Sequence, residues 1–241
     1  NNFPELEKYI LHRLWEIDQK IQESVKTFNF HYMFTTLLNF CSNDLSAFYF
    51  DIRKDAIYCE HLNSPVRRSS RTLLNIIFNY LVRWLAPSLS FTCEEAWKCF
   101  GKKTSIHLED FLTAKEEYKN INLKNKWDLI KNIRKVITGA LEKKRADKTI
   151  GSSLEAHINI YVEDKLKKEI RDIDFSEISI TSSFEILNYN NKKNFFSLDD
   201  VENVGVEVTK TSGYKCNRCW KYKKQLQSID ICERCAKVID E

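Results

Sequence analysis

Two Cys-x-x-Cys pairs near the end of the chain constrain its folding more than any other feature of the sequence. Cys216 and Cys219 form the first pair, and Cys232 and Cys235 form the second, with twelve residues between the pairs. A two-residue gap lets both thiolates of one tight turn reach the same ion at about 2.3 Å, and a second pair completes a tetrahedron. Because protein thiolates would fill all four positions, we predict one structural Zn²⁺ rather than a catalytic one.

The other four cysteines do not share this pattern. Cys41, Cys59, Cys93 and Cys99 lie in apolar, helical-looking stretches and are typical of small core residues. The sequence shows no secretory signal, so reduced thiols are the default. A thioredoxin-type redox pair would need a single motif at a helix start within a βαβ unit, which the sequence does not offer.

The positive charge of the chain is concentrated around the cysteine pairs. The net charge is +4; residues 210–241 carry eight Lys or Arg and four Asp or Glu, whereas the preceding residues carry 30 of each sign. A basic surface of this kind favours a polyanionic partner, although a solvated charged face would have the same composition.

Apolar residues at helical spacing dominate the first part of the chain. Leu6, Ile10, Leu14, Ile17 and Ile21 draw one stripe in steps of three and four. Similar patterns predict helices at 31–41, 71–86, 93–100 and 123–145, with Thr92 and Glu95 as a capping box for the helix at 93–100. We therefore predict a mainly α protein, with an antiparallel helical bundle over residues 1–122 and a long connecting helix over 123–149.

The pattern changes after Gly151. Residues 156–162 alternate between apolar and polar and are rich in β-branched side chains, and 178–189 and 204–210 are similar, with a short helix at 165–172 between them. We predict a small α/β unit over residues 150–210, followed by the cysteine module, residues 211–241, as a separate zinc-binding lobe.

No catalytic constellation emerges from the residues. The five histidines are scattered, and the five glycines are too dispersed to form a loop that cradles phosphates. No apolar run approaches the roughly 18 residues that a membrane span needs. The sequence therefore favours a binding function over a catalytic one, because several stretches mix basic and aromatic residues, as RNA-binding surfaces do.

Several longer stretches are similar to a known family. The stretches "DLSAFYFDIRKDAIYC" and "RRSSRTLLNIIFNYLVRWLAPSLSFTCEEAW" closely resemble the anticodon-binding region of bacterial-type isoleucyl-tRNA synthetases. "ALEKKRADKTIGSSLEAHI" resembles their next segment, and "KCNRCWKY" with "ICERCAK" resembles their C-terminal zinc module. The second stretch is shared more loosely by the valyl, leucyl and methionyl enzymes.

The resemblance implies both a fold and a function. It implies the helical bundle of a class I synthetase that holds the anticodon arm of tRNA(Ile). Full-length members use ATP and Mg²⁺ to activate isoleucine and then charge tRNA(Ile), with His-x-Gly-His and Lys-Met-Ser-Lys-Ser motifs that this sequence lacks. Since the chain also opens on Asn1 rather than methionine, we expect it to be the C-terminal part of such an enzyme and to be inactive alone. We expect a cytoplasmic monomer that does not bind membranes.

The resemblance also implies residue roles. The four cysteines match the zinc ligands of the family, and Trp220 matches an aromatic position that could stack on a base or pack over the zinc-binding turn. Basic positions typical of the family, each a candidate contact to tRNA, are Arg53, Lys54, Arg67, Arg68, Arg71, Arg145 and Lys148. Lys221 is a further candidate contact to tRNA. One alternative stays open, namely a free-standing zinc-ribbon protein that binds nucleic acid or protein without any link to aminoacylation.

Overall fold

The computed structural model describes residues 3–189, 194–227 and 230–239, which fall into two compact units. The first unit comprises Asn1–Ile57 and His61–Ile121, and the second comprises Tyr58–Glu60 and Asn122–Glu241. Helices predominate, and one small mixed sheet accompanies them, so the predicted mainly α class with a small α/β part is confirmed. No helix in these described stretches is long and apolar enough to cross a membrane.

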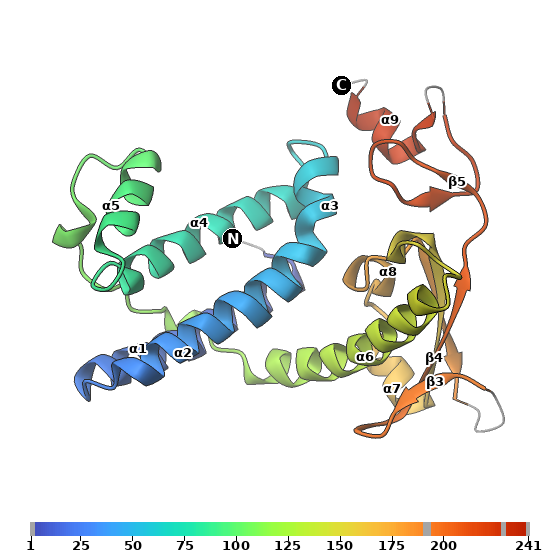
Figure 1. The fold of residues 1–241 in the computed structure, drawn as a ribbon, viewed down its shortest axis with the longest axis horizontal. Coiled ribbons are helices and arrows are strands. Elements are labelled where there is room, and N and C mark those ends of the chain that lie inside the picture. Colours follow the sequence, from blue (N-terminus) through green and yellow to red (C-terminus); the bar gives the residue numbers. More distant parts are fainter. Residues whose placement is uncertain (1–2, 190–193, 228–229, 240–241) are drawn as a thin grey trace. The chain divides into compact units, whose positions relative to one another are not determined.

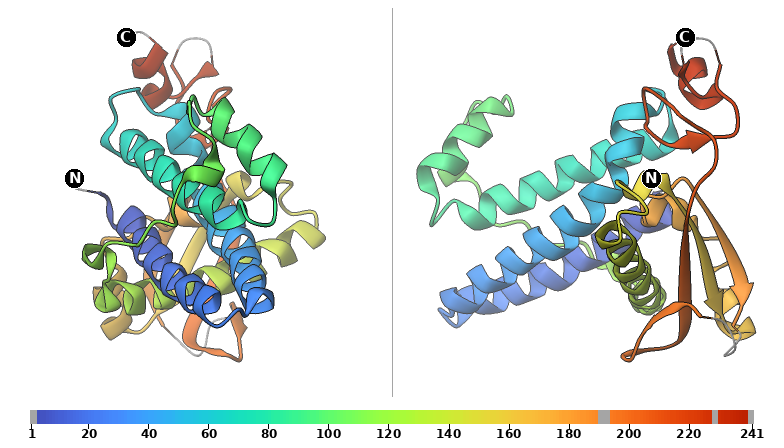
Figure 2. Two further views of the ribbon diagram at one scale, coloured as in Figure 1. Left: turned by 90° about the vertical axis from the view of Figure 1, so that its left-hand side faces the viewer. Right: turned by 45° about the vertical axis from the view of Figure 1, so that its right-hand side comes forward.

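The first unit is helical. Its elements are α1 (Glu5–Lys26), α2 (Phe30–Asn39), a π-helix η1 (Phe40–Phe50), α3 (Asp51–Cys59), α4 (Pro65–Leu85), α5 (Ser90–Cys99) and the 3₁₀ turns η2 (Ile106–Leu108) and η3 (Glu116–Tyr118). The helices α1 and α2 form a hairpin and run side by side (Figures 1 and 2). The predicted apolar stripe of α1 is buried along its whole length, and α4 also contacts α1. Burial of these two faces is what holds the helices together, because isolated helices gain little stability from propensity alone.

A buried polar cluster ties four of these elements to one carboxylate. Glu7 of α1 is fully buried and accepts hydrogen bonds from Arg53 Nε at 2.7 Å and Arg53 Nη2 at 2.8 Å. The hydroxyls of Tyr49 in η1 and Ser70 in α4 also donate to Glu7 Oε1, each at 3.1 Å. A buried charge needs such a set of partners, and no local sequence pattern reveals it.

The start of α5 differs from the predicted capping box. The helix begins at Ser90, so Thr92 lies inside it, and no side chain caps its N-terminus. The side chain of Glu94 instead fixes the loop that follows the helix, because its Oε2 accepts hydrogen bonds from Ser105 Oγ at 2.8 Å and from the Ile106 N–H at 2.9 Å. The prediction of a Thr92–Glu95 box is therefore wrong, since the helix starts at Ser90, three residues before the predicted start at Cys93.

Glu94 should make stability depend on pH. The Lys98 ammonium, the Ser105 hydroxyl and the Ile106 N–H together lower the pKa of Glu94 from 4.5 to about 2. A depressed pKa means that the stabilisation is complete above pH 4.5 and is lost as the pH falls towards 2. We expect Glu94→Gln to lower the melting temperature by a few degrees at neutral pH, and we expect this difference to shrink as the solution becomes acidic. Thermal melts of both proteins across this range check the prediction, with Glu95→Gln as the exposed control; a difference independent of pH would contradict it.

The second unit combines the long helix α6 (Ile121–Ala146) with a four-stranded sheet. After the turn η4 (Ser153–Glu155) come β1 (Ala156–Val162), α7 (Asp164–Ile170), α8 (Phe175–Ile178), β2 (Ser183–Asn188), β3 (Phe196–Leu198) and β4 (Val201–Lys210). The strand order is β2-β1-β4-β3; β2 pairs parallel to β1, and the other two pairs are antiparallel. The central register sets Ile158 opposite Val208 and Ile160 opposite Val206, all buried.

The strand predicted over 178–189 is only half right. Residues 175–178 form the helical turn α8, because Asp174 accepts from the N–H groups of Ser176 and Glu177 and so caps a helix start. The strand begins only at Ser183. The short helix predicted at 165–172 corresponds to α7.

Gly139 allows α6 to approach the sheet closely. A Cβ at this position would lie 2.7 Å from the ring of Phe196 on β3, which is too close for any real contact. Two polar contacts also hold α6 in this unit: Arg134 Nε donates to the carbonyl oxygen of Ile178 at 2.9 Å, and Lys135 pairs with Asp200. The sequence therefore places its one mid-helix glycine where aromatic packing requires it.

Candidate metal centre and nucleic-acid interface

The four cysteines of the cysteine module come together in space. Cys216 follows the strand β5 (Tyr214–Lys215), and Cys219 precedes β6 (Tyr222–Lys223), so the β5–β6 hairpin forms the first turn. Cys232 and Cys235 lie at the start of α9 (Glu233–Ile239). All four are buried, and their sulfur atoms lie within 4.8 Å of one another. The fold therefore gathers the predicted ligand set.

The sulfur geometry fits a tetrahedral thiolate site. Four sulfurs at about 2.3 Å from a central ion would lie about 3.8 Å apart from one another. Cys219 Sγ and Cys232 Sγ are 3.8 Å apart. A disulfide needs about 2.05 Å, and all four residues are free cysteines. The four thiols are thus close enough together to hold one metal ion.

Backbone N–H groups favour the thiolate form of one ligand. The Cys232 N–H donates to Cys216 Sγ at 3.3 Å. Burial opposes ionisation of Cys216, but N–H groups of Cys219, Cys232 and Arg218 outweigh it and lower the pKa of this thiol. Burial raises the pKa of Cys219 and of Cys235, so these two would need the charge of an ion to lose their protons.

The module has almost no apolar core of its own. Besides the cysteines, Ile231 is its only described residue in the buried cluster, with Leu226 and Ala236 partly buried against it. So small a core would leave a bound metal ion as the main source of order, which is how small zinc modules are stabilised.

Cys59 is also buried in this cluster, as a member of the same unit, which agrees with its prediction as a core residue. Cys93 is buried as well, whereas Cys41 is half-buried and Cys99 is exposed, so the prediction of a core position is wrong for Cys99.

Two arginines of the module are engaged by residues 58–60 of the same unit. Arg218 Nη1 donates to the carbonyl oxygen of Cys59 at 2.6 Å, and Arg234 Nη1 contacts the Glu60 carboxylate at 2.9 Å. Their charges therefore stabilise the packing around the cysteine cluster. They are poor candidates for contacts with an external partner.

Trp220 projects from the first cysteine turn. Its backbone N–H donates to the carbonyl oxygen of Cys216 at 2.9 Å, and its backbone adopts the left-handed conformation with φ at 63°. The residue is 60% exposed, with Lys215 Nζ 5.7 Å from the centroid of the indole ring. The indole is therefore accessible to a partner from solution. Lys215, one residue before Cys216, is not among the predicted RNA contacts.

Arg53 is the one predicted RNA contact that the structure argues against. Its side chain is 5% exposed and is held by Glu7 in the buried polar cluster. The residue lies on the inner face of α3, and it therefore stabilises the helical unit and offers no surface to RNA. Its neighbour Lys54 stays a candidate, because its side chain is exposed, with Asp51 at 3.1 Å.

The remaining candidates are spread over both units. Arg68 and Arg71 are exposed on α4, and Arg67 beside them is half-buried. Arg145 lies at the end of α6, where Nη2 donates to Ser153 Oγ at 2.6 Å and Nη1 pairs with Glu142. Lys148 is exposed in a left-handed turn, and Lys221 is half-buried. Of all the candidates, Trp220 and Lys221 alone belong to the cysteine module.

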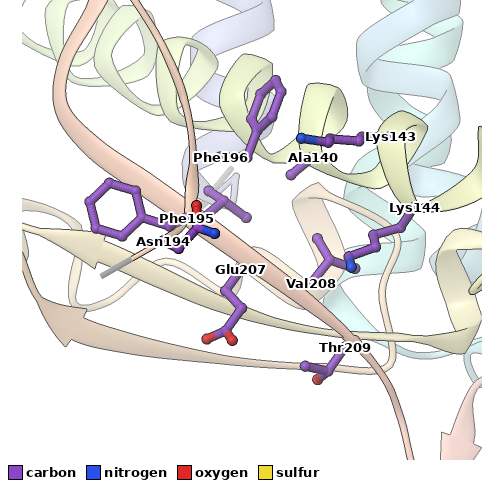
Figure 3. Close-up of a pocket in the computed structure, with 10 residues that line it drawn as sticks. Ala140, Lys143, Lys144, Asn194, Phe195, Phe196, Glu207, Val208 and Thr209 are labelled. Carbon is purple, nitrogen blue, oxygen red and sulfur yellow. The ribbon is translucent and has the colours of Figure 1, made fainter. Parts of the chain in front are cut away.

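A cavity of about 290 Å³ lies between α6, β3 and β4 (Figure 3). Lys143 and Lys144 line it from the last turn of α6, with Phe196 and Val208 across from them. The carboxylate of Glu207 turns away from the two lysines (Figure 3). It accepts a hydrogen bond from Tyr161 Oη at 2.9 Å. The described residues that line the cavity form no cluster of convergent polar groups, so we assign no ligand to it.

Comparison with known proteins identifies the class. Residues 7–160 match the family described as "Anticodon-binding domain of tRNA ligase". Because this match covers well over half of the 241 residues, the chain belongs to the anticodon-binding family of tRNA ligases.

Individual relatives indicate one kind of tRNA ligase. The isoleucine–tRNA ligase of Bartonella henselae is 44% identical over 227 residues, which cover 93% of the chain and 23% of the relative. That of Pelagibacter ubique is 44% identical over 92% of the chain and 23% of the relative, and that of Zymomonas mobilis is 38% identical over 100% of the chain and 25% of the relative. The chain thus spans about a quarter of the length of the curated relatives it matches.

Proposed function

We propose that the chain is the C-terminal part of an isoleucine–tRNA ligase and that it holds the anticodon arm of tRNA(Ile). The family match over residues 7–160 and the similarity to three isoleucine–tRNA ligases support this. Activation of isoleucine with ATP and Mg²⁺, and its transfer to tRNA, would then belong to the other three quarters of the ligase. We also propose that the protein is a cytoplasmic monomer and that this stretch is inactive alone.

We further propose that the cysteine cluster binds one Zn²⁺. Four thiolates in a tetrahedral set with no fifth ligand are typical of structural zinc. When bound, the ion supplies the cross-link that the small core of the module lacks. It would hold the β5–β6 hairpin and α9 together and thereby fix the direction in which Trp220 projects.

We propose that the cysteine module recognises RNA through the exposed indole of Trp220. Anticodon bases are unpaired, so they can stack on an aromatic face that a duplex could not reach. Lys215 beside the ring can meet a neighbouring phosphate, and the positive charge of residues 210–241 attracts the RNA over a longer range. Charge alone holds any RNA, so specificity for tRNA(Ile) must come from base contacts.

Trp220→Ala should weaken binding of tRNA(Ile) without loss of zinc. A base stacked on an aromatic ring contributes about 1–3 kcal/mol by alanine substitution, so we expect about five- to 150-fold weaker binding. Trp220→Phe should keep most of the affinity, and Lys215→Gln should lower the log–log salt slope by about 0.7 for one single-strand phosphate. Anisotropy titrations of labelled tRNA(Ile) over a series of salt concentrations measure both effects.

The control for this experiment is the metal content of each variant. If Trp220 instead supports the zinc-binding turn, Trp220→Ala loses zinc faster to a chelator and the loss of affinity is indirect. The proposed function fails if the parent chain binds the tRNA(Ile) anticodon stem-loop no better than an unrelated hairpin of equal length.

A further inference from the structure

Both cysteine pairs enclose an arginine at the same position. The first pair reads Cys-Asn-Arg-Cys over residues 216–219, and the second reads Cys-Glu-Arg-Cys over residues 232–235. Arg218 and Arg234 each directly precede the second cysteine of their pair. Both side chains are half-buried, whereas most arginines are exposed, as Lys224 of the same module is. The shared position and burial indicate a shared role at the cysteine cluster.

Each arginine contacts a sulfur atom of the opposite pair. The guanidinium of Arg218, in the first pair, donates a hydrogen bond to Cys235 Sγ in the second pair. The guanidinium of Arg234, in the second pair, donates a hydrogen bond to Cys219 Sγ in the first pair. The two contacts therefore cross between the pairs, and each reaches the second cysteine of the pair that it joins.

Further contacts within the same unit hold both guanidinium groups at the cluster. Arg218 Nη1 donates to the carbonyl oxygen of Cys59 at 2.6 Å, and Nη2 donates to that of Tyr58 at 3.4 Å. Both acceptors are uncharged, so they orient Arg218 without offsetting its charge. Arg234 Nη1 pairs with the Glu60 carboxylate at 2.9 Å, where about a third of each side chain is exposed. The charge of Arg234 also repels that of Arg218, and two like charges held this close indicate an anionic centre beside them.

We propose that Arg218 and Arg234 are positioning residues for the metal site, which donate hydrogen bonds to the sulfurs of Cys235 and Cys219 and offset the negative charge of the loaded cluster. Four thiolates around one divalent cation carry two negative charges in excess. Arginine suits this role because its planar guanidinium can reach a sulfur and a carbonyl at once and stays charged when half-buried. This inference rests on the proposed Zn²⁺ site, and it concerns how tightly the ion is held.

Competition with a zinc chelator, on the full chain and its variants, measures the affinity for Zn²⁺ and the rate of its release. Partners that hydrogen-bond to metal ligands contribute about ten- to 100-fold to metal affinity. Because both arginines are half-buried, we expect Arg218→Gln and Arg234→Gln each to weaken Zn²⁺ binding about tenfold, at the lower end of this range. Arg218→Lys keeps the charge and should recover most of the loss. Lys224→Gln is the matched control, because it removes one exposed positive charge from the same module and should change the affinity less than about twofold.

Glu60→Gln separates the effect of charge from the effect of packing. Arg234→Gln and Glu60→Gln break the same ion pair, so a role in packing alone predicts that both weaken Zn²⁺ binding. Charge compensation predicts opposite signs, because removing an acid beside an anionic cluster should tighten Zn²⁺ binding by about two- to fivefold. Losses of equal size in the two variants would overturn the proposal.

Two further outcomes separate this proposal from the metal site itself. If both glutamine variants, shown by circular dichroism to be folded, hold Zn²⁺ like the parent, the role of the arginines is wrong and the Zn²⁺ site stands. If a glutamine variant does not fold, Arg218→Lys and Glu60→Gln still decide between charge and packing. If the parent chain itself takes up no Zn²⁺, the proposed metal site fails.

Discussion

Cys219→Ser should release the metal and unfold the cysteine module while the helices of the first unit stay folded. Apparent binding energies of about 10–16 kcal/mol are typical for structural zinc in small modules, and this module has little apolar core to replace that stabilisation. The first unit buries its own stripe along α1 and α4, so it does not depend on the ion. We expect the parent to carry one zinc per chain and the variant to carry none.

Elemental analysis, circular dichroism and limited proteolysis of the full chain measure this effect. Cleavage should move to residues 211–241 in the variant and in the chelator-treated parent. Cys99→Ser is the matched control, because Cys99 is an exposed cysteine outside the cluster. A parent chain that folds fully with no metal after gentle purification would contradict the assignment.

The cysteine cluster is the part of the protein most open to prediction from sequence. Metal ligands at fixed spacing are local information, and a turn that brings Cys216 to Cys219 needs no knowledge of the rest of the fold. Helix positions are likewise readable where a stripe is long, as in α1 and α6. The cysteine spacing and the helical stripes can both be read within one segment of the chain.

Several features that the sequence did not reveal depend on partners distant in the chain. Arg53 looks like any surface arginine until α1 brings Glu7 beside it, 46 positions away. The stacked pair Phe78–Phe100 depends on how α5 lies against α4. The capping prediction at Thr92 is wrong because α5 begins at Ser90. The composition of residues 40–50 does not indicate the π-helix η1.

The basic residues fall into two groups, those engaged by partners within the protein and those exposed to solvent. Arg218, Arg234 and Arg53 are engaged by carbonyls or carboxylates within the protein, whereas Arg68, Arg71 and Lys215 lie exposed beside aromatic rings. Net charge therefore overstates the surface available to RNA. The pairing of an exposed cation with an exposed ring is the better guide, since it combines phosphate contact with base stacking.

Breaking the Glu7–Arg53 pair should cost the helical unit about 3–5 kcal/mol of unfolding free energy, because the partner left behind is a buried, uncompensated charge. Among the described residues, Arg53→Leu leaves Glu7 with the hydroxyls of Tyr49 and Ser70 alone, and neither can balance its charge. Urea unfolding followed by tryptophan fluorescence measures the loss. Lys54→Leu, one residue away in an exposed pair, should change the free energy by less than about 1 kcal/mol.

The double variant Glu7→Leu, Arg53→Leu shows whether the charge is the cause. Replacing both members of a buried ion pair by apolar residues is often neutral, so the double variant should be more stable than Arg53→Leu alone. It should not recover fully, because the Tyr49 hydroxyl loses its acceptor. Below its melting temperature, Arg53→Leu should bind tRNA(Ile) like the parent. If the folded Arg53→Leu protein instead lost affinity for tRNA(Ile) with its stability unchanged, Arg53 would be an RNA contact after all.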